Sequence, residues 1–140
     1  MFDIRADVDA GLLDEIGGRL DNPRTLLEVA GDALVDYERQ VFATSGFGSW
    51  PANDPETVME KGSGRVLVDT GGVLRDLTSR SSLAYSGDSV AISTSKVGAI
   101  MAKRGARGAP KRDAAPKPTS RHVEQWAERI LAALLTGDRR

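Results

Sequence analysis

The sequence predicts an α+β fold, in which helices flank a small antiparallel β-sheet and two long loops interrupt the regular structure. Three observations carry this prediction. Apolar residues recur at helical spacing near the N-terminus and again over residues 23–43 and 120–135. Two short segments of alternating apolar residues meet at a turn within residues 83–92. Glycine, proline and polar residues dominate residues 44–64 and 103–118, which are the expected loops.

The first predicted elements are a strand and two helices. Apolar and charged residues alternate over residues 2–8, which is the period of a strand with one buried face. The spacing then becomes helical and predicts a short helix over residues 10–21. Asn22 offers an N-cap side chain and Pro23 suits a first helical position, so a longer amphipathic helix is expected over residues 23–43.

The middle of the chain predicts little regular structure. Residues 44–64 contain four glycines and two prolines, which leaves room for at most one helical turn near residues 57–61. A short apolar run at residues 66–68 and a turn at residues 69–72 precede a further helical turn at residues 73–77.

The last predicted elements are a hairpin and a helix. Alternating apolar residues on both sides of Ser86-Gly87-Asp88-Ser89 predict a β-hairpin. Thr119 or Ser120 can cap a final helix that continues to Leu135, before Gly137. The apolar faces of these elements predict one shared core, which includes Leu34, Val41, Leu74, Ile92, Trp126 and Ile130.

Composition indicates one domain and no enzyme. With 140 residues, 40% of them hydrophobic, the chain can form one core, and a single domain is expected over residues 1–140. The sequence has no cysteine and one histidine, His122, which argues against thiol chemistry, histidine-based metal sites and catalytic triads. No apolar run reaches the length of a membrane span or signal peptide, so we expect synthesis in the cytoplasm and no membrane partner.

The candidate enzyme motifs are weak. Gly62-Ser63-Gly64 lacks the lysine-serine pair that a phosphate-binding loop requires, and no serine stands in a nucleophile-elbow pattern. Acid pairs such as Asp14-Glu15 and Asp36/Glu38 could act as acid–base groups, but they are expected on the solvated side of predicted amphipathic helices. We therefore expect no catalytic, cofactor-binding or metal-binding residues.

The charges are distributed unevenly. Residues 103–121 carry seven basic residues and one acid, an excess of six positive charges, and the rest of the chain has an excess of seven negative charges. Because residues 103–118 offer few apolar side chains to a core, they are predicted to form a flexible basic loop that a partner orders. Without aromatic residues for base stacking, the loop would contact phosphates or acidic protein surfaces; the alternative is a solvated connection without a target.

Trp50 is the other candidate contact residue. It stands in a polar loop, where a tryptophan is either an interface anchor or a core residue. The complete set of candidate partner- or DNA-contacting residues is Trp50, Lys103, Arg104, Arg107, Lys111, Arg112 and Lys117.

The order of these segments resembles the phage virion morphogenesis, or tail completion, family related to the phage Mu G protein. The similar features are a long helix ending in Val41-Phe42, a loop with Trp50-Pro51, and a leucine–threonine–glycine–leucine segment followed by a hairpin. Leu67, Thr70, Gly71 and Leu74 match that segment with one additional glycine. Residues 99–105 stand where the family has a tyrosine-histidine stretch but contain neither residue.

The resemblance implies a structural virion protein without catalytic residues. Members of the family join heads to tails as a closed ring in the virion neck, through which DNA passes. The implied partners are further copies of the chain, in a hexameric or dodecameric ring, and the adjacent connector and tail proteins, with non-specific DNA contact in the channel. Two alternatives stay open: a tail terminator ring that caps the tail tube, and a small nucleic-acid-binding regulatory protein.

Overall fold

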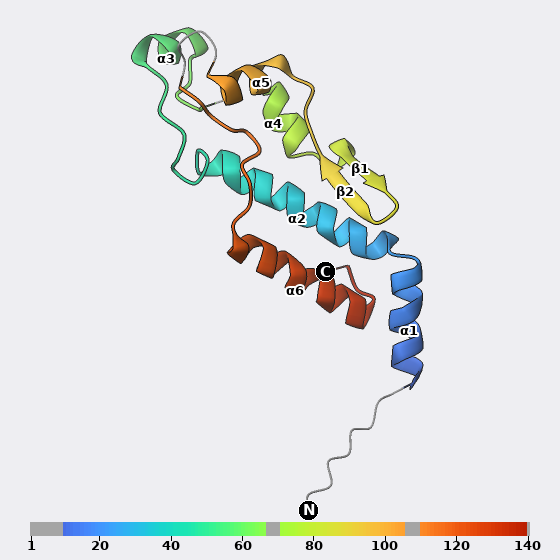
Figure 1. The fold of residues 1–140 in the computed structure, drawn as a ribbon. Helices are drawn as coiled ribbons and strands as arrows, with labels where there is room; N and C mark the ends of the chain where they lie inside the picture. The colour runs from blue at the N-terminus through green and yellow to red at the C-terminus, as the bar shows by residue number, and fades with distance from the viewer. Residues whose placement is uncertain (1–9, 67–70, 106–109, 140) are drawn as a thin grey trace, which may run out of the picture.

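One long helix, α2 (Arg24–Ala43), runs through the middle of the fold. The computed structural model describes residues 10–66, 71–105 and 110–139. The hairpin of β1 (Leu83–Ser86) and β2 (Ser89–Ile92) lies on one side of α2, and α6 (Ser120–Thr136) lies antiparallel to α2 on the other (Figure 1). The described residues also form α1 (Ala10–Asp21), α3 (Pro55–Lys61), α4 (Gly72–Leu77), α5 (Val97–Arg104) and a 3₁₀ turn, η1 (Arg80–Ser82).

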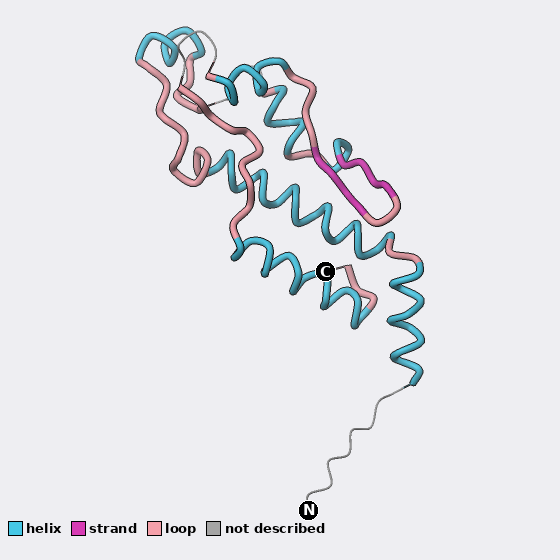
Figure 2. The backbone as a smooth tube through the Cα atoms, viewed as in Figure 1, coloured by secondary structure: helices cyan, strands magenta, loops and turns pink. Residues whose placement is uncertain are grey.

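The structure confirms the predicted fold class, a small antiparallel sheet flanked by helices. Loops over residues 44–54 and 110–119 connect the helical parts, as Figure 2 shows. The predicted strand over residues 2–8 lies outside the described residues, as do Leu67 and Val68 of the predicted apolar run. Among the described helices, none combines the length and apolar character needed to cross a membrane.

Two helices differ from the prediction. α3 begins at Pro55, ahead of the single turn expected near residues 57–61, because Asp54 caps it: the Asp54 carboxylate accepts a hydrogen bond from the Thr57 backbone N–H at 2.7 Å. This bond also holds the pKa of Asp54 below its ordinary value. α5 was not predicted at all, since Gly98 and the basic residues at its end obscured a helix of only eight residues.

The start of α2 corrects the predicted cap. Pro23 occupies the N-cap position itself, and no side chain forms a capping bond there. Asn22 instead ends α1, because its backbone N–H donates to the Gly18 carbonyl at 3.0 Å. α2 therefore follows α1 directly, and Figure 1 shows the sharp change of direction between them.

Both ends of α6 form as predicted. Thr119 is the N-cap, and its hydroxyl and backbone N–H contact Nδ1 of His122, at 2.7 and 3.4 Å, within a capping box. Gly137 ends the helix in the left-handed conformation, with φ of 72°. His122 thus has a local structural role at the helix start.

The hairpin packs closely on α2 because α2 contains a glycine. Leu83 pairs with Ile92 and Tyr85 with Val90, and these four side chains point to the partly buried face. A Cβ atom at Gly31 would lie only 2.8 Å from the Leu83 side chain. Gly31 costs helix propensity but permits this close approach of helix and hairpin.

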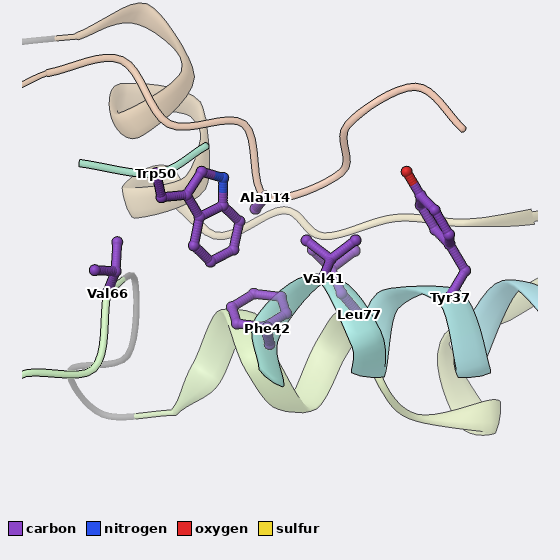
Figure 3. Close-up of a cluster of buried hydrophobic side chains, with 7 residues drawn as sticks. All are labelled: Tyr37, Val41, Phe42, Trp50, Val66, Leu77 and Ala114. Carbon is purple, nitrogen blue, oxygen red and sulfur yellow. The ribbon is translucent and has the colours of Figure 1, made fainter. Parts of the chain in front are cut away.

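The predicted single core is wrong, because the predicted core residues of the described chain divide between two clusters of buried side chains. Val41 belongs to the larger cluster, where Leu74, Ile92 and Trp126 pack at the margin. Ile130 packs against the smaller cluster, and Leu34 is only partly buried. Figure 3 shows the larger cluster, which consists of Tyr37, Val41, Phe42, Trp50, Val66, Leu77 and Ala114. The smaller consists of Leu26, Val29 and Ala133.

Ion pairs join α2 to the segments around it. Arg139, beyond α6, lies 2.9 Å from a Glu28 oxygen and 3.3 Å from an Asp32 oxygen. Arg80 of η1 approaches Asp32 at 3.0 Å, and Arg129 of α6 approaches Asp36 at 3.3 Å. Each pair is partly exposed, so the network orients these elements more than it stabilises them.

Two neighbouring positions on α6 test the described packing. Replacing Ile130 with alanine should lower the free energy of unfolding by about 2 kcal/mol, the low end for a buried isoleucine, because Ile130 is only partly buried. Leu131→Ala is the matched control and, measured on dilute monomeric protein, should change it by about 0.5 kcal/mol or less, since Leu131 is exposed. Urea denaturation of both variants measures the difference, and equal effects would contradict this orientation of α6.

Candidate functional site

The structure answers the open question about Trp50 in favour of the core. The side chain is 7% exposed and stacks edge-on against Phe42, with ring centroids 5.3 Å apart. Its indole N–H donates a hydrogen bond to the Asp113 carbonyl at 3.0 Å. Trp50 is therefore not available as the exposed partner or DNA contact that the sequence analysis had included.

A tight turn after α2 brings Trp50 back onto Phe42. Four successive residues, 45–48, have positive φ values between 50° and 79°. The Trp50 backbone N–H closes the turn by donating to the Ser45 carbonyl at 3.0 Å. Gly46 is required here, because a Cβ atom at that position would lie 2.5 Å from the Trp50 ring.

The basic segment packs against the fold where the structure describes it. Arg112 donates hydrogen bonds to the carbonyls of Pro51 and Ala52 at 2.9 and 3.0 Å, and Ala114 is buried in the larger cluster. The Tyr37 hydroxyl donates to the Pro116 carbonyl at 2.8 Å. The described part of the predicted flexible loop thus has contacts with the fold, because backbone carbonyls and one small side chain can join a core without a run of apolar residues.

The predicted basic contact residues fall into two groups. Arg112 is engaged as described, and Lys103, at the end of α5, lies 3.5 Å from an Asp113 carboxylate oxygen. Arg104, Lys111 and Lys117 are exposed. Arg107 lies outside the described residues. Lys103 is itself exposed and therefore stays a candidate for contact with an acidic partner or phosphates, together with Arg104, Lys111 and Lys117, which form no ion pair among the described residues.

An exposed apolar stripe runs along α6. Val123, Leu131 and Leu135 are 50%, 53% and 45% exposed, and Ala127 completes a series at intervals of four residues. Trp126, Ile130 and Leu134 form the adjacent, partly buried stripe that packs on α2. Sequence analysis combined the two stripes into one apolar face, since helical spacing alone does not separate adjacent stripes.

α1, which contacts the C-terminal end of α6, carries further exposed apolar side chains. Leu12, Leu13 and Leu20 are exposed on α1. The Arg19 guanidinium fixes the two helices together, because it donates to the carbonyls of Leu134 and Leu135 at 2.7 and 3.1 Å. We call the combined area the α1–α6 apolar surface; it consists of Leu12, Leu13, Leu20, Val123, Leu131 and Leu135.

In the described part of the chain, no three histidine, aspartate or glutamate side chains are grouped so that they could hold a metal ion. Two candidate functional features are surfaces: the α1–α6 apolar surface and the exposed cations. No protein-family model, curated protein or solved structure matches the chain.

Proposed function

We propose that this chain is a non-enzymatic structural subunit of a tailed-phage particle, a tail-completion or head–tail joining protein that forms a ring in the virion neck. The order of segments in the sequence, which resembles the tail-completion family, motivates the proposed location in the virion neck. The observation that carries the assembly is the α1–α6 apolar surface, which a chain working alone would leave in water.

The stripe on α6 is suited to helix packing between copies. Side chains four residues apart form a ridge that fits the groove of another helix. Their half-exposed state means that each already contacts its own chain and can bury the remainder against a neighbour. A head-to-tail contact of this kind, repeated around a closing rotation, produces a ring with a central channel.

The exposed cations supply the second contact. Arg104, Lys111 and Lys117 are available for an acidic surface of an adjoining ring or for DNA phosphates in the channel. No stacking aromatic accompanies them in their segment, so contact with DNA would be independent of base sequence and weakened by salt.

A matched pair of substitutions tests the assembly. Leu131→Gln should raise the dissociation constant of the assembled protein about tenfold or more, because it places a polar amide in each repeated apolar contact. Ala132→Gln is the control, since Ala132 is the adjacent exposed residue on α6 but lies outside the α1–α6 apolar surface. Light scattering and native mass spectrometry, with and without tail tubes of the phage, measure the assembled mass.

The outcomes separate the candidate functions. Equal effects of the two variants, or a wild-type protein that stays monomeric even with tail tubes, would overturn the proposed ring. Attachment to bare tube ends that stops tube growth would assign the tail terminator position instead. Binding to duplex DNA without any self-association would favour the nucleic-acid-binding regulatory protein.

A further inference from the structure

Glu38 is a buried carboxyl group on α2. It is 3% exposed, and its Oε2 atom is buried and accepts no hydrogen bond from the residues that the structure describes. Buried carboxyl groups are normally paired, because transfer from water removes hydrogen bonds that the interior must replace. An apolar side chain at this place would avoid that loss, so a carboxyl group here needs a role that an apolar side chain could not fill.

Glu38 lines a pocket that opens to the surface. The cavity has a volume of about 250 Å³. Its walls come from α2, β2, the segment after Asp113 and α6, and are mainly apolar; they include Leu34, Tyr37, Val90, Ile92, Pro116 and Trp126. Because drug-sized ligands fill cavities of roughly 300–1,000 Å³, this pocket matches a single side chain better than a cofactor.

The electrostatic environment favours a cationic occupant. Burial, with a smaller contribution from Asp113, raises the pKa of Glu38 to about 8. The other titratable groups around it do not neutralise it: burial also raises the pKa of Tyr37, and His122 packs against the Tyr37 ring at 5.0 Å. Lys103 does not neutralise Glu38 either, since its ammonium group pairs with the carboxylate of Asp113. An incoming cation would meet a carboxyl group with no counterion of its own.

We propose that this pocket binds the side chain of a lysine presented by a partner protein. The methylene stem lies along the apolar walls formed by Leu34, Ile92 and Trp126, and the ammonium group donates a hydrogen bond to the carboxylate of Glu38, which lines the same pocket. A linear stem with a compact terminal charge suits a small, mainly apolar pocket lined by one carboxyl group, whereas the planar guanidinium of arginine is best bound by paired acceptors. The proposal is independent of the phage assignment, because it uses only the geometry of this pocket.

Binding of the ammonium group should release a proton. An adjacent cation stabilises the ionised carboxylate, so Glu38 must give up the proton that it holds at pH 7. The apparent affinity should therefore increase about tenfold per pH unit from pH 6 toward pH 8 and level off above it. A purely apolar ligand would show no such dependence.

Binding of n-butylammonium, a mimic of the lysine side chain, tests the proposal on the full chain. The indole N–H signal of Trp126 in ¹⁵N NMR spectra should shift and saturate at pH 8, and require about tenfold more ligand at pH 7. The Trp50 indole is an internal control, because its N–H donates to Asp113 within the core. The neutral analogue 1-butanol should bind at least about tenfold more weakly.

A variant and the pH profile together keep the test decisive. Glu38→Gln retains the size of the side chain but cannot ionise, so it should lose the affinity for butylammonium and the dependence on pH. Circular dichroism confirms that it is folded; if it is not, the pH profile of the wild-type protein decides alone. Butanol binding as tightly as butylammonium, affinity unchanged between pH 6 and 8, or no saturable shift would each overturn the proposal.

Discussion

Replacing Trp50 with alanine is expected to lower the free energy of unfolding by about 3–5 kcal/mol, the range for a buried aromatic side chain. The variant loses the contact with Phe42 and leaves a cavity in the larger cluster (Figure 3). It also removes the indole N–H, so the Asp113 carbonyl loses the hydrogen bond that joins the two long loops. Urea denaturation followed by circular dichroism measures the change.

Two further variants identify the cause. Trp50→Phe keeps much of the ring packing but not the N–H donor, so it should cost about 1–2 kcal/mol. Met59→Ala removes a large apolar side chain that is 83% exposed and should change stability by about 0.5 kcal/mol or less. If Trp50→Ala behaved like Met59→Ala, Trp50 would be a surface residue and the described burial would be wrong.

The protein should become less stable as the pH rises from about 4.5 to about 8, because of Glu38. Its pKa is raised from 4.5 to about 8 in the folded state. Below pH 4.5 the carboxyl group is protonated in both the folded and the unfolded chain, so it does not make the free energy of unfolding depend on pH. Between the two values the unfolded chain ionises while the folded chain keeps its proton, so stability falls by up to about 1.4 kcal/mol per pH unit. Above pH 8 both states are ionised and the loss, roughly 3–5 kcal/mol in total, is complete.

Comparison with Glu38→Gln isolates this effect from other carboxylates. The variant cannot ionise at this position, so its unfolding free energy should change much less between pH 5 and 8. Thermal and urea denaturation at four or five pH values in this window give the two slopes. Parallel slopes for the two proteins would show that Glu38 titrates at its ordinary pKa and is in contact with water.

The local elements were predictable because their signals are local. The capping residues of α6, Thr119 and Gly137, stand next to the helix that they end, and the hairpin follows from alternation on both sides of one turn. The burial of Trp50 was not predictable, since the acceptor of its indole N–H is Asp113, 63 residues further along the chain. The packing of Arg112 on the Pro51 and Ala52 carbonyls was not predictable either, because the polar, basic composition of its segment indicates a solvated loop.

The candidate site was predictable only in part. The basic residues of the 103–118 segment were found by counting charge, but their division into engaged and exposed members depends on tertiary contacts. The sequence shows that α6 is rich in apolar residues. It does not show which of them lie on the exposed stripe and which on the partly buried stripe beside it. The predicted place of Glu38 on the solvated side of α2 is wrong, because the structure buries it; an acid on an amphipathic helix is normally solvated, so the sequence did not indicate this burial.

The bond between Trp50 and Asp113 also bears on the order of folding. Closing a loop of 63 residues costs far more chain entropy than forming the hairpin or a helical turn, and that cost precedes any gain from burial. The aromatic end of α2 therefore completes its packing after the local helices and the hairpin have formed. A ribosome-bound chain that has emerged only as far as α5 would hold Trp50 without its acceptor, so this end of the molecule stays open until the last quarter of the chain has been synthesised.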